Sequence, residues 1–290
     1  MALEKQSPCK INLLLNILGK RADGFHELET VMQPINLCDR LEFERADSGV
    51  RLTCSDPLLP TNGKNLVHRA ATLFLKTAGL QDGVRIHLDK KIPVAAGLGG
   101  GSGNAAVTLL ALNELFDGLL DENKLNELAA SLGSDIPFFL QERPALATGR
   151  GEKITPLDPF PAFCGAWVLL VHPGFGISTP WAYEQLARFP EALNGQPDRA
   201  QKLISLLQTA DLAVAGKEFY NSLEAPALRK YPLLVLFQEF FREHGATATL
   251  MSGSGSATFA MVPSEAAAKT LLEKFQKKFG EKFWIVVAQL

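Results

Sequence analysis

Apolar and polar side chains alternate in the first strand-like stretch of the chain. Between residues 7 and 17 the apolar side chains at Cys9, Ile11 and every second position after them share one face. Lys10 and Asn12 occupy the intervening positions. A period of two predicts a strand with one buried face. Lys10 and Asn12 should therefore project from the same side of that strand.

The rest of the first half mixes strand-like and helix-like patterns. A second strand is expected to end near Cys38, and a further strand begins at Asp39. Beyond these strands, apolar residues recur at helical spacing in three segments, and a short segment of alternating apolar and polar residues predicts one further strand. The expected elements are helices over 62–78, 106–116 and 122–131 and a strand over 84–90.

Three prolines between residues 156 and 162 interrupt the pattern, and we place a domain boundary there. The elements expected beyond it are helices over 180–186, 199–207, 227–244 and 264–279 and strands over 167–171, 247–250, 258–262 and 283–287. Strands mixed with helices, without a strict repeat of strand, helix and strand, favour the α+β class. The expected domains are residues 1–160 and 161–290.

Composition excludes several functional classes. Of 290 residues, 47% are hydrophobic and 21% are charged, and no apolar run approaches the ~18 residues of a membrane span. The start of the chain lacks the apolar core of a secretory signal, so a cytoplasmic protein is expected. A net charge of −2 argues against a nucleic-acid partner. The four cysteines are spaced too irregularly for paired zinc ligands or a compact disulfide framework.

A glycine-rich segment from Pro93 to Gly103 is the most informative part of the sequence. It joins an expected strand to an expected helix. The first NH groups of a helix lack intrahelical partners and favour anions, and glycines let a ligand approach the backbone. The segment lacks the lysine of the Walker motif, and Ser102 stands where a dinucleotide fingerprint needs glycine. The segment predicts a phosphate site, with a glycine-rich connector that binds nothing as the alternative.

Three further features are candidates for chemistry. A phosphate loop without its own lysine needs a cation from elsewhere, and Lys10 is a candidate unless it is a solvated surface lysine. Asp135 precedes an apolar run and could orient or deprotonate an alcohol, or else cap the turn before Pro137. The Ser and Gly residues over 251–256 could meet a ligand, although spacing alone favours a hairpin turn.

The chain resembles the GHMP family of small-molecule kinases along nearly its whole length. The segments that carry the resemblance are 8–13, 19–28, 93–106, 133–139, 149–152, 173–174, 177–179, 221–224 and 251–255. The glycine segments are typical of the whole superfamily. The segments 8–13 and 19–28 are similar to the subgroup that phosphorylates a cytidyl polyol diphosphate.

The resemblance implies a fold and a reaction. It implies an N-terminal mixed sheet with helices that carries the ATP loop, and a ferredoxin-like C-terminal domain. The implied reaction transfers a phosphoryl group from ATP, with Mg²⁺, to the 2-hydroxyl of a cytidyl polyol diphosphate in the methylerythritol phosphate route to isoprenoids. No membrane is involved, and a monomer or weak homodimer is expected.

The resemblance also assigns residues. Asp135 matches the catalytic aspartate that polarises or deprotonates the hydroxyl, and Lys10 matches the lysine that holds this aspartate and stabilises developing charge. Ser102 is a candidate metal ligand. The segment that matches the ATP site comprises Pro93, Val94, Ala95, Ala96, Gly97, Leu98, Gly99, Gly100, Gly101, Ser102 and Gly103. The residues that match the substrate site are Asn12, Phe25, His26 and Tyr183.

The sequence departs from the family pattern at four positions, Phe25, Gly103, Ser134 and Ser222, and the first two are among the assigned site residues. Phe25 stands where the family usually has tyrosine, which keeps a stacking ring and removes a hydroxyl. Gly103 replaces a serine and keeps the backbone donor. The alternatives are a kinase for homoserine, mevalonate or a sugar, and a nucleotide-binding or RNA-binding module without catalysis. The segment 23–26 argues against the first, and the near-neutral charge argues against RNA.

Overall fold

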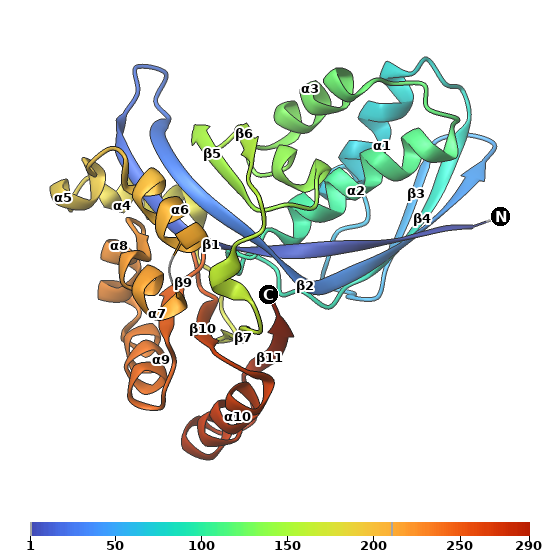
Figure 1. Cartoon of the computed structure of the whole chain (residues 1–290). Coiled ribbons are helices and arrows are strands. Elements are labelled where there is room, and N and C mark those ends of the chain that lie inside the picture. Colours follow the sequence, from blue (N-terminus) through green and yellow to red (C-terminus); the bar gives the residue numbers. More distant parts are fainter. Residues whose placement is uncertain (1, 210) are drawn as a thin grey trace. The chain divides into compact units, whose positions relative to one another are not determined.

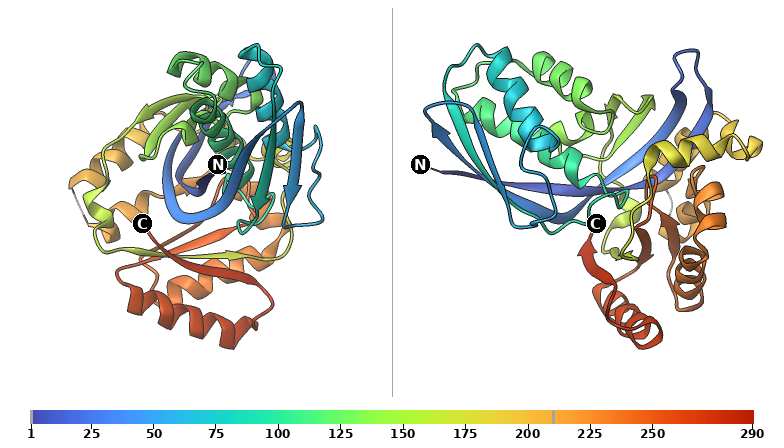
Figure 2. Two further views of the ribbon diagram at one scale, coloured as in Figure 1. Left: turned by 90° about the vertical axis from the view of Figure 1, so that its right-hand side faces the viewer. Right: turned by 180° about the vertical axis from the view of Figure 1, so that it is seen from behind.

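The fold was analysed in a computed structural model that describes residues 2–209 and 211–290 (Figure 1 and Figure 2). The strands form a seven-stranded mixed sheet and a four-stranded antiparallel sheet. The order is β3-β4-β2-β1-β8 in the first, with β5 and β6 paired beside β2, and β11-β7-β10-β9 in the second. Helices alternate with these strands without a strict repeat, which confirms the predicted α+β class.

The elements before residue 160 begin with two long strands. In chain order the elements are β1 (Leu3–Lys20), β2 (His26–Ala46), β3 (Val50–Cys54), α1 (Leu66–Thr77), β4 (Gly83–Asp89), α2 (Gly100–Leu115), α3 (Glu122–Leu132), a 3₁₀ turn (Pro137–Leu140), β5 (Ala145–Gly149) and β6 (Lys153–Pro156). The strands predicted on either side of Cys38 are one strand, β2. The backbone runs through Asp39 without the break that the sequence predicted.

The elements after residue 160 are mostly helical. In chain order they are a 3₁₀ turn (Pro161–Phe163), β7 (Trp167–His172), α4 (Thr179–Leu186), α5 (Pro190–Leu193), α6 (Arg199–Thr209), α7 (Leu212–Ala215), a 3₁₀ turn (Gly216–Glu218), β8 (Tyr220–Asn221), α8 (Glu224–Lys230), α9 (Pro232–Glu243), β9 (Ala248–Met251), β10 (Thr258–Val262), α10 (Glu265–Phe279) and β11 (Trp284–Gln289).

The prediction of one continuous helix over 227–244 is wrong. The structure has two helices there, and Tyr231 separates them with φ −124° and ψ 77°. Pro232 explains the break, because proline lacks an NH and keeps the residue before it out of the helical region. The same proline suits the first turn of α9, where an NH would have no intrahelical partner.

The chain forms two compact units, and neither is a single continuous segment. The first contains the start of the chain to Cys9, Leu37–Pro93 and Gly99–Glu142. The second contains Lys10–Asn36, Val94–Leu98 and Arg143–Leu290. The strands β1 and β2 therefore each contribute to both units. The sequence-based boundary at residue 160 stays a prediction.

The first unit packs helices beside the pairs of β4 with β2 and β3. Helices α1, α2 and α3 contact one another (Figure 1). The side chain of Asn65 caps α1 by accepting from the NH of Val67, and this helix buries Val67, Ala70 and Phe74. Strand β4 pairs antiparallel with the second half of β2 and parallel with β3. This packing holds the start of α2 next to the segment that leaves β4.

The second unit has an aromatic core between its antiparallel sheet and two helices. Helices α9 and α10 contact the strands of this sheet, and Figure 2 shows the dark red α10 beside it. The ring of Phe275 lies 5.1 Å from Phe237 and 5.4 Å from Phe241, centroid to centroid, and all three side chains are fully buried. This sheet with its helices is the ferredoxin-like part that the resemblance implied.

One buried carboxylate supports the hairpin between β9 and β10. Glu224 accepts hydrogen bonds from the NH of Met251 at 2.8 Å and from Gln238 Nε2 at 2.5 Å. Burial raises the pKa of Glu224, and these hydrogen bonds and the charge of Arg242 only partly oppose that rise. The carboxylate therefore ties helices α8 and α9 to the start of the hairpin turn.

Replacing Phe275 by alanine should lower the free energy of unfolding by about 3–5 kcal/mol, because it removes a fully buried ring from the aromatic core. Denaturant unfolding of the variant beside Leu58→Ala measures this effect. Leu58 is 91% exposed, and its replacement should change stability by less than about 0.5 kcal/mol. Equal effects of the two substitutions would contradict the assigned core.

Replacing Glu224 by glutamine should change how stability depends on pH. Because the pKa of Glu224 is raised in the folded state, the folded chain keeps a proton that the unfolded chain has lost. Wild-type stability should therefore fall as pH rises above about 4.3, by up to ~1.4 kcal/mol per pH unit until the folded pKa is passed. Glu224→Gln should lack this component. If the free energy of unfolding changes with pH in the same way for both proteins from pH 4 upward, this role of Glu224 is refuted.

Candidate functional site

The glycine-rich segment ends at the start of a helix, as predicted. It leaves β4 after Asp89, and α2 begins at Gly100. Gly97 and Gly99 have left-handed φ values of 77° and 71°, which glycine adopts without strain. Gly99 is the N-cap residue and supplies no side-chain hydrogen bond to the helix. The first NH groups of α2 are therefore available to an anion.

Close contacts with neighbouring backbone or side-chain atoms explain three of the glycines. A Cβ on Gly97 would lie 2.0 Å from the carbonyl oxygen of Ser252, and one on Gly100 would lie 2.9 Å from a methyl carbon of Ile92. A Cβ on Gly103 would lie 2.8 Å from the carbonyl oxygen of Pro8. The structure thus gives a steric reason for glycine at position 103, where the family usually has serine.

Lys10 lies against the glycine segment and is only 2% exposed. Its Nζ donates to the Gly97 carbonyl at 3.0 Å and to Asn12 Oδ1 at 2.5 Å. Its backbone NH donates to the Leu98 carbonyl at 2.9 Å. Lys10 and Asn12 share a face of β1, as the alternation predicted. The burial rules out the alternative of a solvated surface lysine.

The loop over 251–256 is both a hairpin turn and a partner of the glycine segment. It joins β9 to β10. Ser252 Oγ donates to the Gly97 carbonyl at 2.9 Å, and the NH of Ala257 donates to the Ala96 carbonyl at 2.9 Å. The hairpin turn is therefore confirmed, and contact of this loop with a ligand stays a prediction. The hairpin supports the middle of the glycine segment, next to Lys10.

Asp135 lies in the first unit, whereas Lys10 lies in the second. It occupies the turn between the end of α3 at Leu132 and the 3₁₀ turn that begins at Pro137. Asp135 is half-buried, and Ile136 directly after it is fully buried. The carboxylate thus sits at the edge of an apolar core, as the sequence predicted.

A group of aromatic rings lies where β2 begins. The rings of His26 and Tyr183 are 5.0 Å apart, centroid to centroid, with an interplanar angle of 37°. Phe25 is 51% exposed, and the guanidinium carbon of Arg150 lies 4.6 Å from the centre of its ring. Burial lowers the pKa of His26, and the charge of Lys20 lowers it further. The imidazole is therefore neutral at neutral pH and carries one donor and one acceptor nitrogen.

Sequence reasoning gave Arg150 no role, although the segment 149–152 contributed to the resemblance. The backbone bends sharply around it, because Gly149 and Gly151 have φ values of 73° and 103°. The NH of Arg150 donates to Glu152 Oε2 at 2.7 Å. The signal that could have found this residue is a cation between two glycines and followed by a carboxylate.

Metal ligands are sparse in the part of the chain that the structure describes. Residues 2–209 and 211–290 contain no group of three or more His, Cys, Asp or Glu side chains that could hold a metal ion. Magnesium bound mainly through nucleotide phosphates needs few protein ligands. Ser102, in the first turn of α2, has an oxygen suited to that role. Over the same residues, no helix is long and apolar enough to cross a membrane.

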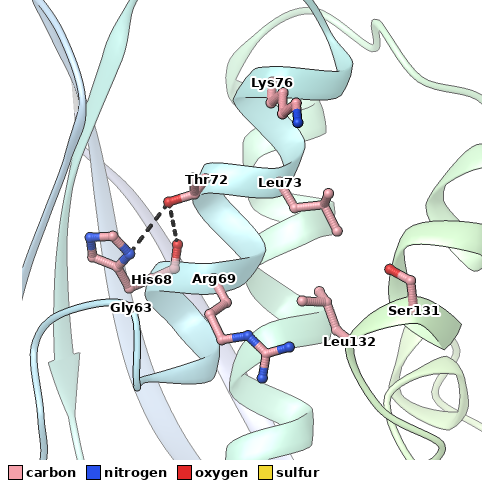
Figure 3. Close-up of a pocket in the computed structure, with 8 residues that line it drawn as sticks. All are labelled: Gly63, His68, Arg69, Thr72, Leu73, Lys76, Ser131 and Leu132. Atoms are coloured by element: carbon pink, nitrogen blue, oxygen red, sulfur yellow. Dashed lines mark hydrogen bonds between the residues drawn. The ribbon is translucent and has the colours of Figure 1, made fainter.

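A separate cavity of about 430 Å³ lies in the first unit, between α1 and α3 (Figure 3). Its lining combines basic, hydroxyl and apolar side chains: Gly63, His68, Arg69, Thr72, Leu73, Lys76, Ser131 and Leu132. Thr72 Oγ1 donates to the His68 carbonyl at 2.8 Å and lies 3.3 Å from His68 Nδ1. None of the residues predicted to bind ATP or substrate lines this cavity.

Comparison with known proteins identifies the family. Residues 65–143 match the model of the GHMP kinases N terminal domain, and residues 191–281 match that of the GHMP kinases C terminal. A 4-diphosphocytidyl-2-C-methyl-D-erythritol kinase of Citrifermentans bemidjiense is 38% identical over 99% of this chain and 98% of its own length. The protein of that name from Protochlamydia amoebophila is 43% identical over 87% of this chain and 82% of its own.

Solved structures agree with these relatives. A crystal structure of 4-(cytidine 5'-diphospho)-2C-methyl-D-erythritol kinase superposes with a TM-score of 0.83 at 36% identity and covers 99% of this chain and 100% of that one. Homoserine kinase from Cytophaga hutchinsonii, at 20% identity and a TM-score of 0.74, covers 100% of this chain and 94% of its own and shares the fold. The glycine segment at the start of a helix and these full-length matches lead to one conclusion: the chain belongs to the GHMP kinase family.

Proposed function

We propose that this chain transfers the γ-phosphoryl group of ATP to the 2-hydroxyl of 4-diphosphocytidyl-2-C-methyl-D-erythritol. The observation that carries the proposal is the full-length similarity to kinases of that name, one of which is 38% identical over 99% of this chain. The pairing of His26 with Tyr183 supports a flat heterocycle as part of the acceptor. The reaction would serve isoprenoid biosynthesis.

The donor end of the proposed site is the segment from Pro93 to Gly103. NH groups at the start of α2 would receive the phosphates of ATP, and the helix dipole would favour their negative charge. The Mg²⁺ that accompanies ATP would be held by phosphate oxygens, with the hydroxyl of Ser102 as the candidate protein ligand. Buried Lys10 supports this assignment, because its ammonium group already touches the Gly97 carbonyl.

The chemical step needs a proton acceptor and a cation. In the proposed mechanism the acceptor oxygen attacks the γ-phosphorus, the bond to the β-phosphate oxygen breaks, and ADP leaves. Asp135 would orient the hydroxyl and take its proton, while Lys10 would stabilise the charge that builds up in the transition state. The amide oxygen of Asn12 is engaged by Lys10, so Asn12 would also hold the lysine in place.

The acceptor end of the proposed site is the aromatic group. We propose that the cytosine ring stacks between Phe25 and Tyr183 and that neutral His26 exchanges a hydrogen bond with its edge. The exposure of Phe25 and the lowered pKa of His26 support these roles. The exposure of the Phe25 ring, over which the cation of Arg150 lies, supports stacking of a base there.

Several broader expectations remain part of the proposal. We propose an N-terminal ATP-binding domain over residues 1–160 and a C-terminal domain over 161–290. We also propose a cytoplasmic monomer or weak homodimer, without a nucleic-acid partner. The small, phosphorylated substrates and the net charge of −2 support this view.

Substituting either proposed catalytic residue should lower turnover strongly. Asp135→Asn and Lys10→Met should each lower kcat at least about 100-fold, because each removes a group that acts in the transition state. Coupled ADP release with the cytidyl acceptor, ATP and Mg²⁺ measures kcat. The matched controls Ser134→Ala and Lys5→Met should keep near-normal activity. Near-normal kcat in a folded Asp135→Asn or Lys10→Met protein would refute the mechanism.

Replacing Tyr183 in the aromatic group should weaken binding of the acceptor and leave binding of ATP unchanged. Stacking of a base on an aromatic side chain is worth about 1–3 kcal/mol, so Tyr183→Leu should raise KM for the cytidyl acceptor at least ~5-fold. KM for ATP should stay within about twofold. Tyr231→Leu, which removes a tyrosine that stacks on Phe175, is the control. Faster turnover of homoserine, mevalonate or a sugar than of the cytidyl acceptor would overturn the acceptor assignment.

A further inference from the structure

The carboxylate of Asp39 is fully buried, and the proposed reaction does not use it. It lies in the second half of β2 and receives four hydrogen bonds. Oδ1 accepts from the NH of Lys91 at 2.7 Å and from the NH of Ile92 at 2.8 Å. Oδ2 accepts from Lys90 Nζ at 2.5 Å and from Asn104 Nδ2 at 2.9 Å. All of these contacts lie within the first unit.

The four donors come from the two ends of the glycine segment. Lys90, Lys91 and Ile92 directly precede Pro93, where the segment begins. Asn104 directly follows Gly103, where it ends. One carboxylate therefore bridges the residues that enter the segment and the residue that leaves it. We call these contacts of Asp39 with Lys90, Lys91, Ile92 and Asn104 the loop clamp.

The loop clamp is packed tightly against the start of α2. Lys90 Nζ also donates to the Ile92 carbonyl at 2.6 Å. A Cβ on Gly100 would lie only 3.1 Å from this Nζ. Asn104 donates a further hydrogen bond to Ser7 Oγ at 3.0 Å, which ties α2 to β1. Any change in the clamp would therefore move the first turn of α2.

A buried ion pair is a costly way to gain stability. The side chains of Lys90 and Asp39 are 6% and 0% exposed, and removing two charges from water offsets much of their attraction. Apolar side chains of similar volume would often stabilise a core equally well. Apolar side chains, however, could not accept directional hydrogen bonds from two backbone NH groups and one side-chain amide. The geometry of the clamp therefore points to a positioning role.

We propose that Asp39 is a positioning residue that sets the spacing between the two ends of the glycine segment. By this spacing it aims the NH groups at the start of α2 at one point, where the phosphates of ATP bind. The inference rests on the proposed binding of ATP by this segment. It assigns the effect of Asp39 to ATP and none to the cytidyl acceptor.

Isothermal titration of the whole protein with ATP and Mg²⁺ tests the inference without needing an acceptor. The amide of Asp39→Asn keeps an oxygen for the NH groups of Lys91 and Ile92, but its NH₂ would face the NH₂ of Asn104. ATP affinity should fall at least ~10-fold. The double substitution Asp39→Asn with Asn104→Asp restores a donor facing an acceptor, keeps a carboxylate near Lys90, and should restore affinity to within about threefold. In activity assays, KM for the acceptor should change less than twofold.

Two further variants separate positioning from stability. Leu112→Ala removes a fully buried side chain from α2 without touching the clamp, and it should lower the melting temperature and leave ATP affinity unchanged. If Asp39→Asn does not fold, Asn104→Ala breaks the bridge at the α2 end alone and should weaken ATP binding in the same way.

The outcomes that would overturn the inference are distinct from those that would overturn the function. Unchanged ATP affinity in a folded clamp variant, a loss that the double substitution does not reverse, or an equal loss in Leu112→Ala would each overturn the role of Asp39. A wild-type protein that does not bind ATP would overturn the proposed function itself.

Discussion

The carbonyl oxygen of Gly97 receives two side-chain donors, and the geometry of the candidate site depends on this contact. Lys10 Nζ and Ser252 Oγ donate to it at 3.0 and 2.9 Å. The contact is possible only because residue 97 is a glycine, whose missing Cβ makes room for the backbone of Ser252. It brings a buried cation to a segment that has no lysine of its own. The proposed phosphate site, which has no Walker lysine, would thereby gain a positive charge from β1.

Buried side chains contact the glycine segment at its middle, within the second unit, and at its ends, within the first. Lys10 and the hairpin at Ser252 hold the middle, and Asp39 bridges the two ends. Donors fixed before the ligand arrives bind a developing charge without the cost of reorganising the backbone. This arrangement explains why glycines and buried polar side chains occur together here. The glycines permit the approach, and the buried polar groups set its direction.

Local patterns in the sequence predicted the parts of the site that depend on neighbours along the chain. A helix at the end of the glycine segment followed from the glycines, although α2 begins at Gly100, earlier than the apolar spacing indicated. The shared face of Lys10 and Asn12 followed from the alternation in β1. The helix break at Pro232 was missed, because apolar spacing continued across the proline. The roles of Asp39 and Arg150 were also missed. Asp39 contacts Lys90 and Asn104, which lie 51 and 65 residues away in the sequence. Arg150 contacts the ring of Phe25, which belongs to a distant part of the sequence. Such contacts exist only once the strands have paired.

The most direct test of the account is where ATP contacts the chain. Backbone amide chemical shifts of the whole ¹⁵N-labelled protein, recorded with increasing ATP and Mg²⁺, report that location. The account predicts the largest shifts over residues 97–103, at the start of α2, and smaller ones at the ends of the segment. Shifts confined to His68, Arg69 and the other residues of the cavity between α1 and α3, with the glycine segment unaffected, would contradict it.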